Sequence, residues 1–503
     1  MPSRSPCDSM KLQHNIRKQV TEMIITLQIE IGKEKIENFE DLTVAARKIA
    51  LQIGREIVKQ TLKAWDDNIC EHRNKKRYRC KGKRKTCIKT WFGDIEYERN
   101  VYVDNQSGEC GKCVYLLDEE KKISKIGCVD AEMCKMAAQS VIKSSYRGAA
   151  KEISDMTGLS ISAQGVWNIV QKIGKNRREQ IKQYAKQARQ NKGVGKVESK
   201  ILYEENDGIW LSLQGKSREK YGAASEMKVG IAYDGATWQI GKGKKKRRTL
   251  DNKVAYAAFE GAADFRKHKE GIVASHFNVD EIEQRIINGD GAQWIQKSSD
   301  VPCICVLDKF HRNKKITECV KDNEFAKLLR KLLYEGNIDD LMLCLEAGIN
   351  SAEDLSEQKK MKELYTYYDN NREALSDPYS RGVKIPETRE PGVVHHARLG
   401  SMESNVFTLI GNRMKGRRAS WSIDGANHLA AILCAEHTTG MHYIFGTEQE
   451  VPIVWENKPD TLPMSAAKVP KRVGRGYEPQ HSAILPSLPW LKQLVAFKPL
   501  GEI

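Results

Sequence analysis

Three acidic residues, widely separated in the chain, have the types and surroundings that suit metal-dependent chemistry. Asp207 lies in a hydrophobic segment of strand length, where a carboxylate is costly unless it is paired or bound to a metal ion. Asp290 follows a second such segment, between two glycines that allow a tight turn and a close approach of the backbone to a ligand. Glu403 opens an expected helix. Such hard oxygen ligands predict a site for Mg²⁺ or Mn²⁺.

Each acid also has a purely structural interpretation. An aspartate in an Asp-Gly pair is common in turns, and a glutamate in the first turn of a helix interacts favourably with the helix dipole. Taken singly, each acid fits this structural interpretation. The catalytic interpretation therefore requires a fold that brings Asp207, Asp290 and Glu403 together.

The order of the expected elements predicts such a fold. Three consecutive strands, a helix, a strand, a helix and a strand is the order of a ribonuclease-H-like α/β domain. Leucine-rich helices within 314–375 predict an all-helical insertion before Glu403. The expected strands are 201–213, 227–240, 253–260, the segment that ends at Asp290, and the apolar run within 301–311.

The charge balance indicates a polyanionic partner. The 503 residues include 83 Lys plus Arg against 66 Asp plus Glu, a formal net charge of +17. With 40% hydrophobic and 30% charged residues, the composition excludes collagen-like and wholly disordered chains. No apolar run approaches the ~20 residues of a membrane helix, and residues 1–17 lack a secretory apolar region, so we expect no membrane partner. Nucleic acid is the simplest partner; the alternative is a basic protein with no such role.

The excess of positive charge is concentrated in four stretches, at 73–89, 175–192, 242–248 and 413–418. The first stretch leads into alternating segments joined at Phe92-Gly93-Asp94, which predicts a small basic β module. Contacts to phosphates and bases are the functional interpretation, and a solvated basic face is the alternative. The candidate DNA-binding residues are Arg77, Lys83, Arg84, Trp167, Lys244, Lys245, Arg247, Arg413, Lys415, Arg417, Arg418 and Trp421, the last with simple packing as its alternative.

A helix-turn-helix pattern occupies residues 143–174. A short amphipathic helix ends at Gly158, and Ser160 or Ser162 is placed to cap a second helix that carries Trp167. The second helix of such a pair enters the major groove in many DNA-binding proteins. The basic segment that follows predicts a solvated linker helix, and residues 15–65 predict another helix earlier in the chain.

The thirteen cysteines are odd in number and irregularly spaced, which favours a reducing cytoplasm. One Cys-x-x-Cys pair stands in a loop-like stretch, but its spacing from the upstream ligands matches no standard zinc finger. We therefore expect loop or packing roles rather than structural Zn²⁺. The residues concerned are Cys70, His72, Cys80, Cys87, Cys110 and Cys113.

Several phrases resemble those of ISLre-type insertion-sequence transposases, long catalogued as an uncharacterised bacterial protein family. The phrases are ENDGIWLSL, NGDGAQWI, LDKFH and GSMESNVFTLIGNRMKGRRASWS, preceded by KRKTCIKTWFGDIEYERNVY and YLLDE. The resemblance covers nearly the whole chain and implies a DDE transposase, distantly similar to Mutator-type enzymes, with a ribonuclease-H-like domain and a helical insertion. Asp207, Asp290 and Glu403 match its catalytic acids. Asp308 and His311 match an Asp/Cys-x-x-His element that positions DNA or a metal-bound water, or buttresses the strand end.

The implied reaction is DNA cleavage and strand transfer at the ends of an insertion sequence. Two Mg²⁺ or Mn²⁺ ions about 3.5–4 Å apart stabilise the attacking and leaving oxygens. We expect Asp207 to bridge the ions, with Asp290 and Glu403 beside them. Water then releases a 3′-hydroxyl, which attacks target DNA. The implied partners are double-stranded DNA, as terminal inverted repeats and target, and a second copy during synapsis, in a cytoplasmic, nucleoid-associated protein.

Two other functions are weighed against this one. A non-catalytic, transposase-derived DNA-binding regulator would use the helix-turn-helix and the basic module alone. A carboxylate-based hydrolase such as a glycosidase also uses paired acids, but it leaves the net charge and the helix-turn-helix without a role.

Seven regions are expected from these patterns. They are an N-terminal helical region (1–70), a basic β-rich module (71–125), a helix-turn-helix with its linker helix (126–195), the first part of the catalytic core (196–312), the helical insertion (313–385), the second part of the core (386–455) and a Pro-rich tail (456–503).

Overall fold

The fold is described from a computed structural model, which describes residues 36–106, 113–123, 125–190, 195–240, 246–296, 303–378, 382, 386, 399–416 and 418–438. The predicted tail and the first part of the predicted 15–65 helix lie outside these residues. So do Cys110, Lys244, Lys245 and Arg417, while Arg247 is described by its backbone alone.

The N-terminal helix and the basic hairpin form one structural unit. Helix α2 (Phe39–His72) packs against β2 (Gly93–Asp104), which pairs with β1 (Tyr78–Thr90) in a five-stranded sheet of order β3-β2-β1-β5-β4. Asp66 of α2 accepts hydrogen bonds from the backbone and side-chain nitrogens of Asn100 on β2, at 2.9 and 2.8 Å. The predicted boundary at residue 70 is therefore wrong, because it divides a shared core. That core contains Leu62, Ile69, Ile88, Ile95, Tyr97, Tyr102, Leu116 and Leu117.

Three helices follow the small strands of this unit. The short elements are β3 (Cys113–Val114), α3 (Leu116–Glu120), β4 (Lys125–Ile126) and β5 (Val129–Asp130), and the helices are α4 (Ala131–Lys143), α5 (Tyr146–Thr157) and α6 (Ala163–Arg189). Gly158 ends α5 in the left-handed conformation, at φ 69°. Ser162 caps α6 by accepting a hydrogen bond from the Gly165 amide at 3.0 Å. The predicted pair of helices is present.

The predicted solvated linker is wrong, because it is the second half of α6 and packs against other helices. Gly174 lies so close to the His428 backbone that a Cβ atom would meet its carbonyl oxygen at 2.3 Å. Gly271 of α8 (Ala262–His276) approaches Ala185 of α6 equally closely. Ile181 is buried between these two contacts. One continuous helix thus joins the helix pair to the central domain.

The central sheet has the order β10-β7-β6-β11-β12. Its strands are β6 (Ile201–Ser212), β7 (Ala224–Tyr233), β10 (Val254–Ala258), β11 (Gln284–Gly289) and β12 (Cys303–Leu307). β6, β7 and β10 run antiparallel, whereas β6, β11 and β12 run parallel. The predicted strand 227–240 is corrected: the chain leaves the sheet at Tyr233, and β8 (Gly235–Ile240) pairs with β9 (Lys246–Asp251) in a separate hairpin.

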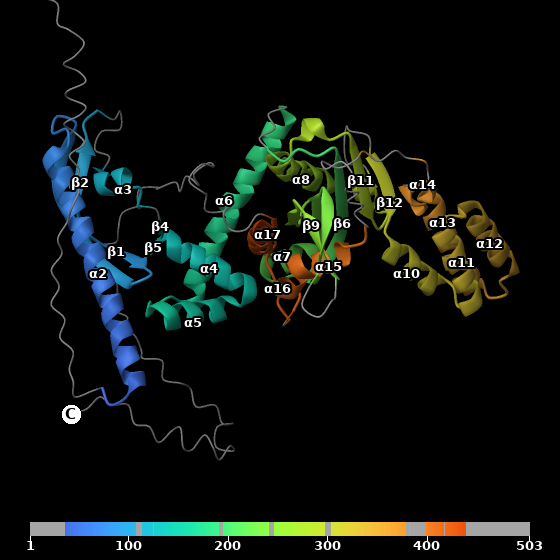
Figure 1. The fold of residues 1–503 in the computed structure, drawn as a ribbon, viewed down its shortest axis with the longest axis horizontal. Coiled ribbons are helices and arrows are strands. Elements are labelled where there is room, and N and C mark those ends of the chain that lie inside the picture. The colour runs from blue at the N-terminus through green and yellow to red at the C-terminus, as the bar shows by residue number, and fades with distance from the viewer. Residues whose placement is uncertain are drawn as a thin grey trace, which may run out of the picture. The chain divides into compact units, whose positions relative to one another are not determined.

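Helices α8 and α17 (Ile423–Thr438) pack against strand β10, and both also contact α6 (Figure 1). Helix α17 is enclosed on most sides, with its residues from Gly425 to Cys434 almost all buried. Smaller elements complete this domain. They are α7 (Gly215–Tyr221), η2 (Val279–Glu281), α9 (Gln293–Gln296), α15 (Met402–Val406), a π-helical turn at Phe407–Gly411 and α16 (Asn412–Met414).

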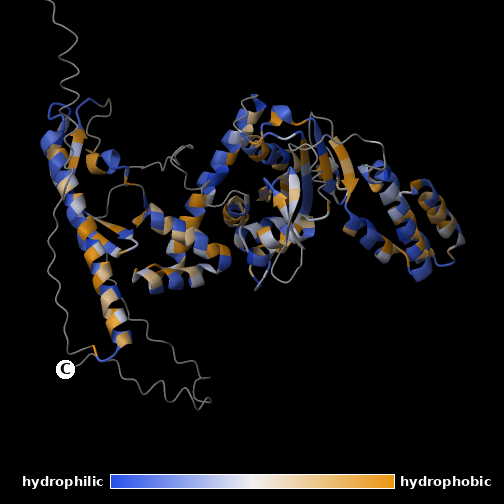
Figure 2. Cartoon of the chain, viewed as in Figure 1, coloured by the Kyte–Doolittle hydropathy of each residue, from blue (hydrophilic) through white to orange (hydrophobic). Residues whose placement is uncertain are grey.

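The segment after β12 is helical, as predicted. It consists of α10 (Lys309–Cys319), α11 (Asn323–Glu335), α12 (Ile338–Ser351), α13 (Leu355–Asn370) and α14 (Arg372–Leu375). Hydrophobic and hydrophilic residues alternate along these helices, as expected for helices that bury one side (Figure 2). Their buried side chains form one cluster that includes Leu307 at the end of β12. No helix in the described residues has the length and apolarity needed to cross a membrane.

Two leucines of α12 test the packing of this helical insertion. Leu345 is fully buried, whereas Leu343 on the same helix is 63% exposed. We expect Leu345→Ala to destabilise the insertion by about 2–5 kcal/mol through loss of burial and cavity formation, and Leu343→Ala by less than about 0.5 kcal/mol. Hydrogen exchange of peptides from α11 to α13 measures the loss of stability in the two variants. Equal protection in the two variants would contradict the packing described.

Candidate active site

Three aspartates lie at the same level of the parallel part of the sheet. Asp207 lies within β6, whereas Asp290 and Asp308 directly follow β11 and β12. The ladder between β6 and β11 pairs Glu205 with Asn288, so Asp207 and Asp290 are each two residues further along. The ladder between β11 and β12 pairs Gly289 with Leu307, which places Asp308 level with Asp290. Ligand sites of open α/β sheets commonly form at such strand ends.

Asp207 is partly buried within this acidic group. One of its carboxylate oxygens accepts a hydrogen bond from the Gly208 amide at 2.7 Å. Burial raises the pKa of Asp207, and the neighbouring Asp290 and Asp308 carboxylates raise it further, against the opposing effects of Gly208 and His311. A carboxylate crowded by other acids in this way is one that a cation would stabilise.

Asp308 and His311 form a hydrogen-bonded pair at the start of α10. Asp308 caps the helix by accepting the backbone N–H groups of Phe310 and His311, at 3.0 and 3.1 Å. The same carboxylate faces the His311 Nδ1 atom at 3.1 Å, and Asn288 donates to its other oxygen at 3.1 Å. Burial alone would raise the pKa of Asp308, but the hydrogen bonds from His311 and Asn288 lower it. The hydrogen bond to Asp308 in turn raises the pKa of His311, against the effect of burial.

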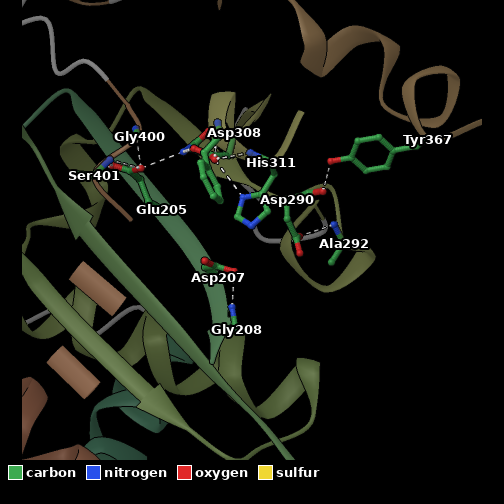
Figure 3. Close-up of polar contacts among 12 residues, drawn as sticks. Glu205, Asp207, Gly208, Asp290, Ala292, Asp308, His311, Tyr367, Gly400 and Ser401 are labelled. Atoms are coloured by element: carbon green, nitrogen blue, oxygen red, sulfur yellow. Dashed lines mark hydrogen bonds and ion pairs between the residues drawn. The ribbon is translucent and has the colours of Figure 1, made fainter. Parts of the chain in front are cut away.

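Glu403 reaches this group from α15. A small pocket of about 30 Å³ has room for at least one water-sized group. The residues that line it include Asp207, Asp308, His311 and Glu403. Asp290 does not line the pocket: its carboxylate turns back to accept the Ala292 amide at 2.9 Å (Figure 3).

The predicted metal ligands are close in the fold but are not gathered into a ready set. In the part of the chain that the structure describes, no group of three or more His, Cys, Asp or Glu side chains is arranged to hold a metal ion. The donor chemistry nevertheless fits a divalent cation, because hard carboxylates converge on a pocket edge where burial and like charges raise the pKa of Asp207. Asp207, Asp290 and Glu403 are the residues that would hold it.

Glu205 is the important site residue that the sequence did not reveal. It is fully buried, and its carboxylate accepts hydrogen bonds from Tyr233 at 2.7 Å and Asn288 at 3.0 Å. It also accepts the Gly400 amide at 2.8 Å and the amide and hydroxyl of Ser401 at 3.1 and 2.5 Å (Figure 3). Glu205 thus fixes the turn that precedes α15 to the central strand, which places Glu403. The one available signal was the Glu204-Glu205 pair in the apolar strand that carries Asp207, which does not distinguish Glu205 from Glu204.

The helical insertion contacts the loop that carries Asp290. The Tyr367 hydroxyl of α13 donates to the Asp290 carbonyl at 2.7 Å. Gly291 has φ +87°, and the Asn371 side chain lies against it, 2.8 Å from where a Cβ atom would stand. The helical insertion therefore holds the loop that carries Asp290, in addition to interrupting the domain.

The predicted DNA-binding residues divide into exposed and internally engaged groups. Lys415 and Arg418 are exposed, Trp167 is 38% exposed, and the exposed Arg84 donates to the Tyr115 hydroxyl at 3.3 Å. Lys83 faces Asp67 at 3.4 Å in an exposed pair.

Three of the predicted residues form contacts within the protein. Arg77 forms an ion pair with Asp104 at 2.8 Å. Arg413 donates from its Nε atom to the Val141 carbonyl at 2.5 Å, and its role as a phosphate ligand stays a prediction. Trp421 is only 7% exposed and donates to the Met414 carbonyl at 2.8 Å, so stacking on a base is replaced by packing.

The sequence profile of the uncharacterised protein family UPF0236 matches residues 33–446. The chain belongs to this family. A UPF0236 protein of Caldanaerobacter subterraneus subsp. tengcongensis, whose name joins eleven gene designations, is 24% identical over 401 residues, covering 78% of this chain and 77% of the relative. Another from the same organism, with two designations, is 24% identical over 453 residues, covering 85% and 84%. A protein of Streptococcus gallolyticus, "UPF0236 protein in vanSb 3'region", is 22% identical over 308 residues, covering 58% and 60%.

Replacing Glu205 by Gln tests its role in holding the turn before α15. The neutral amide offers one acceptor oxygen where the carboxylate offers two, so donors of Gly400 or Ser401 lose their partner at a cost of about 1–3 kcal/mol each. We expect faster hydrogen exchange in peptides covering 399–406. Glu226→Gln on the neighbouring strand is the matched control and should leave that exchange unchanged. Unchanged exchange in Glu205→Gln as well would contradict this role.

Proposed function

We propose that this UPF0236 protein is a DDE-type DNA transposase of an insertion sequence. The observation that carries the proposal is the level arrangement of Asp207, Asp290 and Asp308 at one sheet edge, with Glu403 lining the same pocket. Asp308 caps α10 and Asp290 accepts an amide within its own turn, but these local roles do not require acids so distant in the chain to lie together. A common site for cations and phosphate explains their convergence.

The sheet topology supports a ribonuclease-H-like assignment for the domain. Numbered along the chain without the β8–β9 hairpin, the strands stand in the order 3-2-1-4-5, with the first three antiparallel and the last two parallel to the first. This is the arrangement expected from the order of elements in a ribonuclease-H-like fold. The helical segment α10–α14 lies between the third aspartate and Glu403, where the transposase resemblance places an insertion.

The names of the relatives give independent support. Single UPF0236 protein names in one Caldanaerobacter genome join eleven, four and two gene designations. A gene that copies or moves itself produces many equivalent loci in one genome. A structural protein or a single-copy regulator gives no reason for such multiplicity.

The residues of the site have distinct roles in this proposal. When bound, divalent ions held by Asp207, Asp290 and Glu403 would stabilise charge on the attacking and leaving oxygens of a phosphodiester. Glu205 holds Glu403 in place through the Gly400–Ser401 turn. Asp308 holds the Nδ1 atom of His311, which leaves the Nε2 atom to meet a phosphate oxygen at the pocket. Because its pKa is raised, His311 favours the protonated form that suits this contact.

The alternative function is a DNA-binding regulator without catalysis. The exposed basic residues of β1 and the α5–α6 helix pair favour DNA binding whether or not the acids act. An assay of DNA cleavage distinguishes the two proposals, whereas an assay of DNA binding does not, because both proteins would bind DNA. The cytoplasmic, nucleoid-associated location and the pairing of two copies during synapsis belong to the transposase proposal.

Cleavage of the DNA that flanks its own gene is the decisive test. Duplexes taken from the two gene flanks, incubated with Mg²⁺, should be cut at element ends and joined to target DNA. We expect Asp207→Asn to reduce the rate by at least about a hundredfold, because its carboxylate would hold the metal ions. Asp280→Asn, an exposed aspartate of the same domain, is the control and should retain the activity. Binding without cleavage by the unmodified protein would favour the regulator, and cleavage that survives Asp207→Asn would exclude this site.

The basic strand β1 provides a separate prediction about DNA affinity. Arg84 and Lys85 are exposed and each should neutralise one phosphate. We expect the double variant Arg84→Ala/Lys85→Ala to weaken binding to all duplex sequences and to reduce the slope of log K against log salt by about two. Lys327→Ala/Lys331→Ala, which removes two exposed lysines of α11, should leave the slope unchanged. Fluorescence anisotropy over a salt series measures the slopes of both variants. If the β1 variant has the same slope as the unmodified protein, β1 does not belong to the DNA interface.

A further inference from the structure

A second and larger cavity adjoins the candidate active site. Its volume is about 680 Å³, within the ~300–1,000 Å³ of typical ligand pockets. We call it the Lys253 cavity. Residues of β9, of the turn before β10, of α8, of α15 with the π-helical turn, and of α17 line it. They are Thr249, Leu250, Asn252, Lys253, His276, Ser401, Ser404, Asn405, Thr408, His437 and Thr438.

One helix separates the Lys253 cavity from the acidic pocket. The Lys253 cavity is lined by residues at positions i, i+3, i+4 and i+7 of this segment, which lie on one side of a helix. They are Ser401, Ser404, Asn405 and Thr408. Met402 and Glu403 of the same segment line the acidic pocket instead. A ligand that extends through both spaces would therefore cross only the width of α15. The π-helical turn at Phe407–Gly411 continues this wall, and such turns are frequent at functional sites.

The charge of the Lys253 cavity favours an anionic ligand. Among the described residues, its lining includes one lysine and two histidines but no Asp or Glu side chain. The Lys253 amine donates to the Asn405 side-chain oxygen at 3.1 Å, and none of the described acids pairs with it. Burial lowers the pKa of Lys253, which means that the charged amine is destabilised by the loss of water. A bound anion would offset that loss. His437, whose pKa burial and Lys253 lower, adds a neutral hydrogen-bonding ring.

A chain of hydrogen bonds couples Lys253 to the turn that carries the last acid. Asn405 accepts from Lys253 with its side-chain oxygen and donates to the Ser401 carbonyl with its side-chain nitrogen, at 2.9 Å. The amide and hydroxyl of Ser401 in turn donate to Glu205. An anion at Lys253 would thus contact the same short segment that places Glu403.

We propose that the Lys253 cavity binds one unpaired nucleotide of the DNA strand, with its phosphate at Lys253 and its base and sugar in the remaining volume. The inference rests on the proposed function, since it assigns part of the substrate to a space next to the catalytic acids. A phosphate alone would leave most of 680 Å³ unfilled, whereas a nucleoside phosphate uses both the cation and the polar walls. The cavity then selects DNA whose end is frayed or opened, because extracting a paired base costs a few kcal/mol.

Two DNA probes that differ in one feature test the inference. Both are fluorescein-labelled duplexes of the same gene-flank sequence, one blunt and the other with a single unpaired terminal nucleotide. We expect the wild-type protein to bind the second probe about tenfold or more tightly. Lys253→Met should bind both equally, Lys253→Arg should restore part of the difference, and Lys228→Met, another partly buried lysine of the same sheet, should retain it.

Thermal unfolding separates this binding role from a structural one. Since Lys253 is a partly buried amine without an acidic partner in the described residues, Lys253→Met should match or exceed the wild-type midpoint while it loses the preference. Equal binding of both duplexes by the wild type would overturn the inference and leave the transposase proposal intact.

A free nucleotide distinguishes the remaining cases. If the wild type binds neither duplex, the proposed function fails. Titration with deoxythymidine monophosphate then shows whether the Lys253 cavity binds a nucleotide at all. Binding that is lost in Lys253→Met would support the cavity as a site for free nucleotides. No binding would overturn it.

Discussion

The arrangement of the site depends on one buried carboxylate. Glu205 stands in the central strand of the sheet and accepts hydrogen bonds from the strand on either side and from a turn almost two hundred residues later in the chain. An ionised group removed from water is tolerated only when hydrogen bonds surround it. The bonds that make Glu205 tolerable are therefore the same bonds that attach α15 to the sheet.

The alternation of side chains along β6 gives the strand two polar faces with different purposes. Glu204 points to the opposite face from Glu205 and is buried with Lys269 of α8 and Arg285 of β11. Coulomb attraction to these two cations overcomes the effect of burial and lowers the pKa of Glu204. One face of the strand thus carries a balanced ionic network against a helix, whereas the other carries Glu205 and Asp207, whose pKa burial and the neighbouring acids raise. The imbalance is confined to the face that meets the pocket.

The sequence predicted the elements well wherever a local pattern determined them. Apolar runs located β6, β11 and β12, and capping chemistry located the break at Gly158 and the start of α6 at Ser162. The prediction from sequence failed where tertiary contacts determine the structure. Nothing local reveals that 227–240 bends out of its sheet at Tyr233, or that the basic half of α6 packs closely against α8. Asp207 and Asp290 could be chosen because acids are rare in apolar segments, but Glu205 is defined by partners in three other segments that no spacing connects.

The sequence distance between Glu205 and its last partners has a consequence for synthesis. Ribosomes add about 5–20 residues each second, so Glu205 is added to the chain roughly 10–40 s before Gly400 and Ser401. During that interval the strand has a carboxylate without two of its backbone donors, and Glu403 has not been made. The nascent chain, still attached to the message of its own gene, therefore has an incomplete site until the ribosome has passed Glu403.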